Sequence, residues 1–263
     1  MSPNIPDKFG STHNEAIRRE FEKQAPTFTD ARYTYQLDWM IKELDPQPDD
    51  IVLDVAAGTG HIARPLAAKA RYVIAMDLTA EMLRRGKAEA DAASIHNILF
   101  ELGDAAHLPY LDASFDLVTC RFAVHHFEDP KLQLAEMIRV CRPGGRIGII
   151  DMVASSNPVI AREHNRLERL RDQTHTEALS LEALTNLLGQ LGAPVTRHAT
   201  LDAEMSANVW LASSQTPEEH AEQIRAAWQA EIDGGPITGM RPFLRDGKLR
   251  FTQTWAVVVG VKA

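Results

Sequence analysis

Residues Ile51–Ala63 constrain the fold more than any other stretch of the chain. The segment reads IVLDVAAGTGHIA, which is an apolar, β-branched run, a turn that contains Gly58 and Gly60, and the start of a helical pattern. Strand, glycine turn and helix in this order form a βα unit that lets backbone approach a ligand closely. A second apolar run, Tyr72–Met76, ends at Asp77, where an acid at the tip of a second strand is placed to accept both hydroxyls of a ribose. These features predict a cofactor that carries a nucleoside.

The alternation of strand and helix patterns continues as far as Asp151. Strands are expected over 51–55, 72–76, 97–102, 114–120 and 147–151, and helices over 61–70, 79–93 and 131–140. A turn, Arg142–Arg146, precedes the fifth strand, and Thr79 has the residue type of a helix N-cap. Strands separated by helices of this length predict parallel βαβ units in a doubly wound α/β sheet.

After Asp151 the alternation of strand and helix patterns ends, and most of the remaining residues have a helical pattern. Helices are expected over 155–172, 180–191, 204–211 and 217–232, with strands over 194–201 and 251–261 and a turn at Asp246–Gly247. Two more helices, over 13–23 and 31–44, precede the first strand. We therefore expect one Rossmann-like core with a helical cap over the C-terminal edge of the sheet. Residues 1–45 supply N-terminal cap helices, 46–152 the cofactor-binding core, and 153–263 cap helices and closing strands of the same core domain.

Composition narrows the class of partner. The chain has 263 residues and a formal charge of −8, which disfavours a nucleic-acid or anionic-membrane surface because both need clustered Lys and Arg. Its two cysteines, Cys120 and Cys141, lie in apolar stretches and are interpreted as core residues of a reducing compartment. No His, Cys, Asp and Glu residues are spaced as metal ligands, and no signal core or membrane-length apolar run occurs. We expect no metal, a cytoplasmic location, and a monomer or homodimer.

The glycine turn alone fits two nucleoside cofactors. Gly58 to Ala63 satisfies the dinucleotide fingerprint G-x-G-x-x-G/A, so an NAD-binding interpretation is legitimate. Asp54, however, stands just before the glycines, where a pyrophosphate is repelled and an amino-bearing ligand is favoured. Gly103-Asp104-Ala105 follows the third strand, where a carboxylate can accept a hydrogen bond from an adenine amino group. Together these acids favour a cofactor without phosphates.

At this point the chain resembles a known family. Asp54–Gly60 matches the first motif of class I S-adenosylmethionine-dependent methyltransferases, Asp77 the second, Gly103-Asp104 the adenine-side motif, and Arg142–Gly145 the turn before strand five. The resemblance is to the small-molecule group that includes the ubiquinone and menaquinone biosynthesis C-methyltransferases. It is close over about residues 30–192 and looser over 193–263. The family prefers Gly where this chain has Ala56, a departure that trims the space for the methionine part only slightly.

The resemblance implies a seven-stranded mixed sheet whose last strand is antiparallel, with S-adenosylmethionine lying over the ends of strands one and four. It implies that a methyl group moves by direct displacement to an O, C or N atom of a small organic molecule, leaving S-adenosylhomocysteine. The implied cofactor-binding residues are Asp54, Ala56, Gly58, Gly60, Asp77, Leu78, Gly103, Asp104, Ala105 and Arg121. Arg121 is a candidate for the methionine carboxylate, with a surface ion pair as the alternative.

Methyl transfer needs a base only if the acceptor keeps its proton at neutral pH. His125, after strand four, is the candidate base, and Asp151, at the end of strand five, is its candidate partner or a base itself. One of His125 and His126 is expected to be a structural hydrogen bonder instead. His175 is expected in an exposed turn. The aromatic residues Phe28, Tyr33, Tyr35 and Trp39 either wall an acceptor pocket or are core residues.

Three other functions stay open at this stage. An NAD(P)-dependent oxidoreductase is motivated by the glycine fingerprint. A non-catalytic protein that keeps the S-adenosylmethionine-binding fold would act as a regulator or partner subunit. A nucleic-acid methyltransferase is disfavoured by the acidic charge.

Overall fold

The structure is a computed structural model that describes residues 12–25 and 34–263. Two of the four candidate aromatic residues, Phe28 and Tyr33, lie outside these ranges, as do the first residues of the helix expected over 31–44. All the expected core strands fall inside the described ranges.

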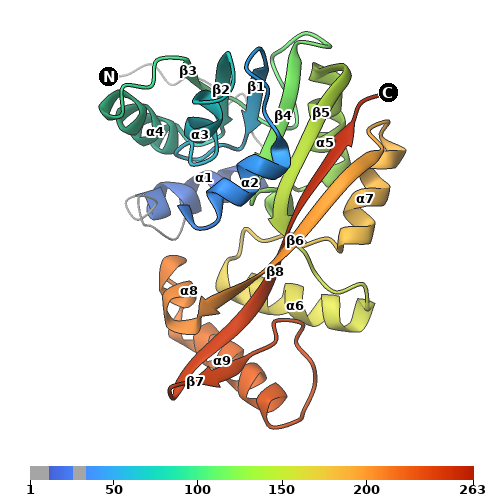
Figure 1. The fold of residues 1–263 in the computed structure, drawn as a ribbon. Coiled ribbons are helices and arrows are strands. Elements are labelled where there is room, and N and C mark those ends of the chain that lie inside the picture. Colours follow the sequence, from blue (N-terminus) through green and yellow to red (C-terminus); the bar gives the residue numbers. More distant parts are fainter. Residues whose placement is uncertain (1–11, 26–33) are drawn as a thin grey trace.

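A mixed sheet forms the centre of the molecule (Figure 1). Its order is β3-β2-β1-β4-β5-β8-β6, and a short strand β7 is paired to β8 outside this path. The strands are β1 (Ile51–Val55), β2 (Tyr72–Asp77), β3 (Ile98–Leu102), β4 (Phe115–Arg121), β5 (Cys141–Met152), β6 (Val195–Ser206), β7 (Phe243–Arg245) and β8 (Lys248–Val261). The first five strands are parallel, and β8 is antiparallel to both β5 and β6. The predicted mixed sheet with an antiparallel last strand is confirmed, and β7 is an addition to it.

The helices connect and cover these strands. They are α1 (Thr12–Gln24), α2 (Leu37–Leu44), α3 (Ala63–Ala67), α4 (Ala80–Ala92), the 3₁₀ turn η3 (Val124–His126), α5 (Pro130–Val140), α6 (Pro158–Arg171), α7 (Leu181–Gln190), α8 (Ala207–Ser213) and α9 (Glu218–Ile232). Helix α3 begins two residues later than expected, because the turn that closes with the Gly60 N–H donating to the Ala57 carbonyl delays its start. Strand β6 continues five residues beyond its expected end at Leu201, because its pairing with β8 persists as far as Ser206.

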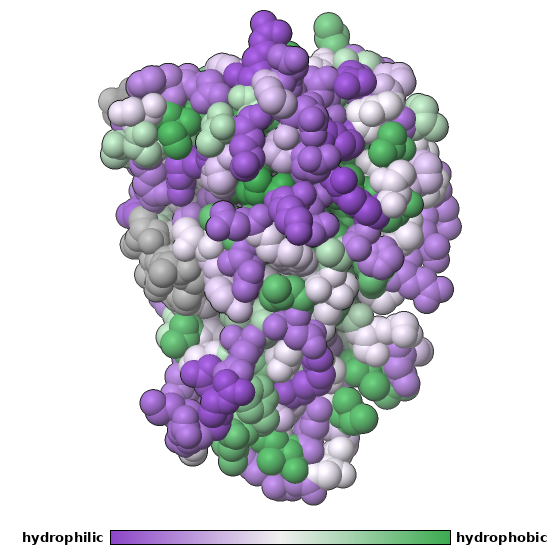
Figure 2. All heavy atoms as spheres, in the orientation of Figure 1, coloured by the Kyte–Doolittle hydropathy of each residue, from purple (hydrophilic) through white to green (hydrophobic). Residues whose placement is uncertain are grey.

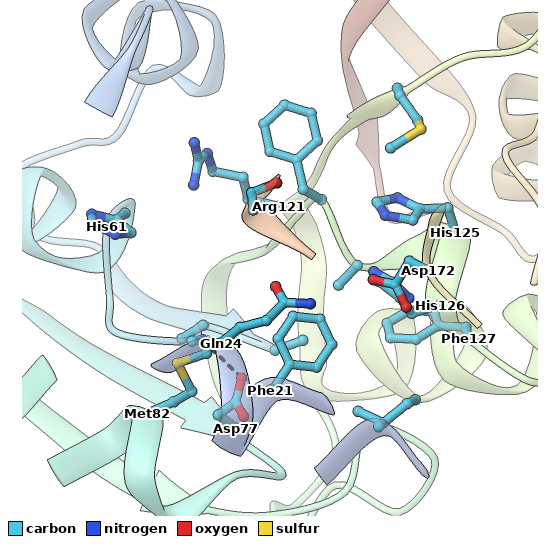
Figure 3. Close-up of a pocket in the computed structure, with 18 of the residues that line it drawn as sticks. Phe21, Gln24, His61, Asp77, Met82, Arg121, His125, His126, Phe127 and Asp172 are labelled. Atoms are coloured by element: carbon cyan, nitrogen blue, oxygen red, sulfur yellow. Dashed lines mark hydrogen bonds between the residues drawn. The ribbon is translucent and has the colours of Figure 1, made fainter. Parts of the chain in front are cut away.

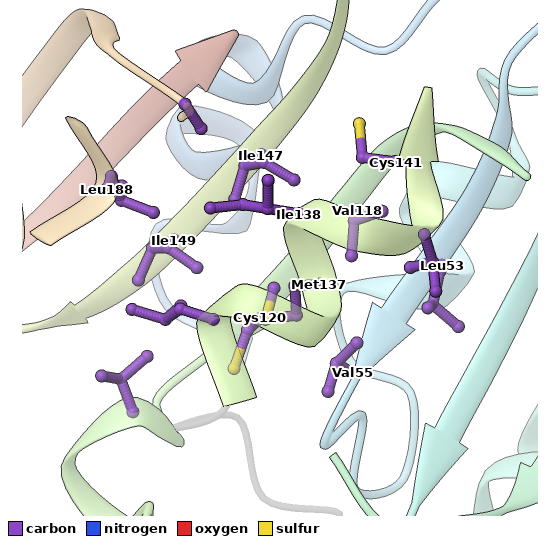
Figure 4. Close-up of a cluster of buried hydrophobic side chains, with 14 of the residues drawn as sticks. Leu53, Val55, Val118, Cys120, Met137, Ile138, Cys141, Ile147, Ile149 and Leu188 are labelled. Carbon is purple, nitrogen blue, oxygen red and sulfur yellow. The ribbon is translucent and has the colours of Figure 1, made fainter. Parts of the chain in front are cut away.

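One apolar core lies between the sheet and helices α5 and α7. Figure 4 shows side chains of β1, β4 and β5 gathered against Met137 and Ile138 of α5 and Leu188 of α7. Cys120 and Cys141 are free, buried members of this cluster, which confirms the expectation that both are core residues. Nearly continuous burial along β4 and along residues 147–152 of β5 explains why these segments read as apolar runs rather than alternating ones.

Two further apolar clusters complete the fold. The second packs α2 and α3 against residues of β1, β2, β5 and β8. The third joins Trp210 of α8, Trp228 of α9 and Phe251 of β8, whose ring centroids lie 4.7 to 5.5 Å apart. In Figure 1 the long strands β6 and β8 extend from the main sheet to the region of this third cluster, where they lie beside α6, α8 and α9. The hairpin of β7 and β8 turns at Asp246 and Gly247, both with positive φ, as their turn signal predicts.

The surface is mostly polar on the face shown in Figure 2, with hydrophobic residues scattered singly or in small groups. Within residues 12–25 and 34–263, none of the helices is long and apolar enough to cross a membrane.

The strand order places a switch point between β1 and β4. From β1 the chain moves outward to β2 and β3, and it then returns to β4 on the other side of β1 and continues to β5. In open doubly wound sheets, ligands bind outside the carboxyl ends of the strands at such a point. The glycine turn after β1 and the histidine segment after β4 therefore flank the same crevice.

Candidate functional site

A cavity of about 700 Å³ lies at the carboxyl ends of the central strands. One half is lined by segments that follow β1, β2 and β3, and the other by segments after β4 and by residues of β5, β6, β8 and α8. Figure 3 shows Asp77 and Met82 on one side and His125, His126 and Asp172 on the other. Side chains of α1, including Phe21 and Gln24, also line the cavity. A pocket of this size can hold a cofactor-sized ligand and a small second molecule.

The turn after β1 depends on left-handed backbone. Ala56, Gly58 and Gly60 have φ of 55°, 57° and 76°. Glycine adopts this region freely, whereas alanine pays a steric penalty, which explains why a glycine suits the position of Ala56. Close packing also explains a glycine that the motif does not include. A Cβ on Gly86 of α4 would lie 2.7 Å from the carbonyl oxygen of Thr59.

Asp77 holds the glycine turn and the start of α4. Its Oδ2 accepts the N–H of Gly58 at 2.8 Å, and its Oδ1 accepts the N–H of Thr79 at 2.8 Å. Burial raises the pKa of Asp77, although these two N–H donors act in the opposite direction. Thr79 does occupy the N-cap position of α4, but its side chain makes no capping hydrogen bond. Each carboxylate oxygen has two lone-pair sites, so Asp77 keeps acceptor capacity toward the cavity.

Asp104 connects the tip of β3 to helix α1. Its Oδ2 accepts a hydrogen bond from the Asn14 side chain at 2.9 Å, and its Oδ1 accepts the N–H of Ala106 at 2.9 Å. His13 of the same helix lies with Nε2 2.8 Å from the carbonyl oxygen of His126. Helix α1 is thus attached to both halves of the cavity, and it covers the predicted adenine contact.

Asp54 is fully buried at the end of β1, and neither carboxylate oxygen makes a hydrogen bond within the described residues. Burial raises the pKa of Asp54 well above its usual range, the positive charge of Arg121 opposes this rise, and the charge of Asp77 adds to it. Arg121 lines the cavity and stacks over the ring of Phe122 at 4.9 Å. Asp54 is therefore not part of the cavity lining, but it lies close enough to Arg121 for the charge of that residue to act on its pKa.

His125 and Asp151 form a buried pair. His125 Nδ1 lies 2.5 Å from Asp151 Oδ1, and the backbone N–H of His125 donates to Asp151 Oδ2 at 3.2 Å. Burial alone would lower the pKa of His125, but the charge of Asp151 and its hydrogen bond, with smaller contributions from Glu168 and Asp172, raise it. With Nδ1–H donating to the carboxylate, Nε2 of the neutral ring is the basic nitrogen. Nε2 makes no hydrogen bond within the described residues, and His125 lines the cavity.

The ring of His126 is hydrogen-bonded to the backbone, although this residue also lines the cavity. Its Nδ1 lies 3.0 Å from the carbonyl oxygen of Thr174, and burial lowers its pKa to about 4, with His125 contributing in the same direction. The expectation that His175 lies in an exposed turn is wrong. His175 is 3% exposed, and its Nε2 lies 2.7 Å from Asn165 Oδ1, because the segment after α6 folds back against η3.

Most of the predicted residues meet at the cavity. Those that line it are Ala56, Gly58, Asp77, Leu78, Gly103, Asp104, Ala105, Arg121 and His125. Asp54, Gly60 and Asp151 do not line it; they stand directly behind residues that do. Of the aromatic candidates, Tyr35 lines the cavity, whereas Trp39 packs against the second apolar cluster.

Sequence reasoning did not identify the wall on the side of β8. This wall contains Trp210, Arg250, Gln253 and Trp255. Gln253 and Trp255 are two residues apart on one strand, so the period-two pattern of a strand places them on one face. That pattern was available in the sequence, but nothing in it indicates which face meets a cavity. His61, in the glycine turn, was also not singled out and lines the cavity.

Within residues 12–25 and 34–263, the structure contains no cluster of three or more His, Cys, Asp or Glu side chains that could hold a metal ion.

Comparison with known proteins places the chain among methyltransferases. A family model described as a methyltransferase domain matches residues 52–145, which include the glycine turn, Asp77, Asp104 and His125. The chain is 30% identical to YcgJ, an uncharacterised methyltransferase of Bacillus subtilis, over 207 residues that cover 78% of this chain and 82% of the relative. It is 46% identical to a demethylmenaquinone methyltransferase of Deinococcus radiodurans over 102 residues, which cover 38% of this chain and 42% of that protein.

Solved structures agree with these sequence matches. The crystal structure of YcgJ superposes with a TM-score of 0.79 and 28% identity, covering 87% of this chain and 98% of YcgJ. A putative methyltransferase of Bacillus halodurans superposes with the same TM-score of 0.79 and 25% identity, covering 86% of this chain and 98% of that one. These relatives decide between the two nucleoside cofactors that the glycine turn alone leaves open.

Proposed function

This chain belongs to the S-adenosylmethionine-dependent methyltransferases, and we propose that it methylates a small organic acceptor held in the half of the cavity between His125 and Trp255. The observation that carries the proposal is the single cavity that joins Asp77 and Asp104 to the buried pair of His125 and Asp151. When bound, S-adenosylmethionine supplies a methyl group on a positively charged sulfur, and its transfer leaves the thioether S-adenosylhomocysteine.

The residues of the first half fit this cofactor by their chemistry. The cavity wall is acidic at Asp77 and Asp104, which suits ribose hydroxyls and an adenine amino group and would repel a pyrophosphate. We assign Asp77 to the ribose and Asp104 to the adenine amino group. Because Asn14 already donates to Asp104, helix α1 would orient that carboxylate or move when the site fills. Arg121 is assigned to the carboxylate of the methionine part, and its charge opposes the rise in the pKa of the buried Asp54.

The remaining assigned residues act through backbone and shape. The turn after β1 supplies Ala56, Gly58 and Gly60, and the segments after β2 and β3 supply Leu78, Gly103 and Ala105. At Gly103 an added Cβ would lie 2.5 Å from the sulfur of Met76, so the wall has room for hydrogen only. We propose that α1, α6, α8 and α9 form the cap of the site, because α1, α6 and α8 contribute residues to the lining of the cavity, whereas α7 packs in the apolar core beside the sheet.

His125 is assigned as the general base for an acceptor that must lose a proton. Its Nδ1 is engaged by Asp151, so the pair fixes the ring orientation and stabilises the imidazolium that forms when Nε2 takes a proton. For an O–H or N–H acceptor this step makes the nucleophile. For an acceptor that is already nucleophilic, His125 would serve only to position it, so the atom methylated, O, C or N, follows from the acceptor.

We further propose a cytoplasmic enzyme of small-molecule metabolism that works as a monomer or homodimer. The supporting observation is that both cysteines are unpaired and buried, as is usual in a reducing compartment. The demethylmenaquinone methyltransferase of D. radiodurans is covered by this chain over only 42% of its length, so its named acceptor is not assigned here.

The test of the proposed function is release of S-adenosylhomocysteine from S-adenosylmethionine in the presence of a library of phenols, amines and enolisable carbonyl compounds. We expect turnover with at least one class and none with nicotinamide cofactors. Saturable cofactor binding without conversion of any acceptor would favour the second candidate, a non-catalytic binding protein. Saturable NAD binding without S-adenosylmethionine binding would refute both.

A further inference from the structure

We propose that Trp255 is the face on which a flat, unsaturated acceptor lies, and that Gln253 and Glu168 are positioning residues that set the plane of its indole ring. This inference rests on the proposed function, because it concerns the acceptor half of the same cavity. The proposed class of acceptor is one with a π face, and Gln253 and Glu168 act on the acceptor only through Trp255.

The place of Trp255 in the sheet separates it from the cofactor contacts. Asp77 and Asp104 follow β2 and β3, whereas Trp255 lies on β8, three strands beyond β1 in the sheet order. Its neighbour in the register is Met152 at the end of β5, one residue after Asp151. Trp255 therefore lines the cavity on the side of the sheet that carries the candidate base.

Two aromatic rings meet Trp255 at their edges. Phe122 lies 4.9 Å from it at an interplanar angle of 68°, and Tyr35 lies 5.8 Å away at 74°. All three residues line the cavity. Because Trp255 lines the cavity, part of its indole can meet a bound acceptor, and stacked or edge-on aromatic pairs are favoured beyond the area that they bury.

A buried hydrogen-bond chain fixes the indole. Trp255 Nε1 donates to Gln253 Oε1 at 2.8 Å, and Gln253 Nε2 donates to Glu168 Oε1 at 3.0 Å. Exposure is 5% for Trp255 and Gln253 and 0% for Glu168. An ionised carboxylate accepts only, so the amide of Gln253 has to direct its nitrogen to Glu168 and its oxygen to the indole.

Glu168 lies at the buried end of this chain of hydrogen bonds and is held ionised. Burial would raise its pKa, but the contact with His164 and the charges of Arg171 and His175 lower the pKa to about 2. His164 Nε2 and Arg171 Nη1 each lie 3.7 Å from its carboxylate oxygens. Burying an ionised carboxylate costs desolvation free energy. A buried carboxylate that acts on a cavity residue is therefore consistent with a role in specificity rather than in stability.

The experiment measures binding of a matched pair of probes to the full-length enzyme loaded with S-adenosylhomocysteine. The pair is 1-naphthol and decahydro-1-naphthol, which share a carbon skeleton and a hydroxyl, but only 1-naphthol is flat and has a π face. Calorimetry should show that the wild type prefers 1-naphthol by about 2- to 12-fold, the range expected of aromatic contacts. Gln253→Met, which fills the space but makes neither amide hydrogen bond, should abolish most of this preference.

A double-mutant cycle then tests whether Gln253 acts through Trp255. In a Trp255→Leu background, Gln253→Met should have no further effect on the preference. Trp255→Phe, which keeps a ring but lacks the N–H, should resemble Gln253→Met and serves if Trp255→Leu does not fold. Affinity for S-adenosylhomocysteine should stay unchanged in every variant that folds.

Three results would overturn the inference. They are no measurable binding of 1-naphthol to the loaded wild type, an unchanged preference in Gln253→Met, and an effect of Gln253→Met that persists without Trp255. Failure of the wild type to bind S-adenosylhomocysteine would instead refute the proposed function, so the two failures are distinguishable.

Discussion

Replacing Asp54 by Asn should change how the stability of the cofactor-free protein depends on pH. Asp54 is 0% exposed, its two carboxylate oxygens make no hydrogen bond within the described residues, and burial raises its pKa well above the ordinary value of 3.8. The folded protein therefore keeps this proton to a higher pH than the unfolded chain does. Stability from this group is fully present below pH 3.8 and is lost as the pH rises toward the folded pKa.

The size of this pH dependence is set by the one proton that the Asp54 carboxyl binds. Between the unfolded and folded pKa values, the folded state binds up to one proton more, so the free energy of unfolding falls by up to about 1.4 kcal/mol for each pH unit. Asn cannot titrate, so Asp54→Asn removes this slope. The free energy of unfolding of the variant minus that of the wild type should therefore be larger at pH 6 than at pH 5, by up to about 1.4 kcal/mol.

Urea unfolding followed by circular dichroism at the two pH values measures this difference. The control is Asp49→Asn, at an exposed aspartate in the turn before β1. A difference for Asp54→Asn that is the same at pH 5 and pH 6 would show that Asp54 is already ionised in the folded state over this range. The account of Asp54 as a buried carboxyl that keeps its proton, because the charge of Arg121 only partly offsets its burial, would then be wrong.

Three further predictions concern the glycine turn, the ribose contact and the base. Gly86→Ala places a Cβ 2.7 Å from the Thr59 carbonyl oxygen and should lower both stability and S-adenosylhomocysteine affinity by about 1–3 kcal/mol, as overpacking does. The control Gly189→Ala, whose Cβ would have no atom within 4 Å, should stabilise the protein by roughly 0.5–1 kcal/mol. Thermal melts measure the stability of both variants, and calorimetry measures their cofactor affinity. Asp77→Ala should weaken cofactor binding by about 1.5–3 kcal/mol, the scale of lost charge-assisted hydrogen bonds, and unchanged affinity would remove Asp77 from the ribose site. His125→Ala should cut turnover by about 10²–10⁴-fold with cofactor affinity intact, and near-wild-type turnover of this variant would make His125 structural. Turnover of the wild type should rise as the pH increases through the raised pKa of His125.

The core strands could be predicted from sequence because each is a short apolar run bounded by a turn. The expected strand over 51–55 coincides with β1, and the pairing of the closing strand with 194–201 is confirmed by its register. The Asp246–Gly247 turn was also identified, because two successive residues with positive φ leave a strong local signal. Local chemistry decides such features, so a single sequence is enough.

Features that depend on tertiary packing were harder to predict. His175 looks like part of an exposed turn, but it is buried because the segment after α6 packs against η3. The motif leaves open whether Asp54 contacts the ligand or acts only through the geometry of the loop or water, and the structure leaves it out of the cavity lining. The β8 wall was missed because alternation along a strand gives two faces and does not say which one meets a cavity.

The central claim is that the cavity at the ends of β1 and β4 binds S-adenosylmethionine through Asp77. Calorimetric titration of the purified protein with S-adenosylhomocysteine, and separately with NAD, tests it most directly. The account predicts saturable one-to-one binding of S-adenosylhomocysteine, weakened in Asp77→Ala, and no binding of NAD. Saturable binding of NAD with none of S-adenosylhomocysteine would contradict it.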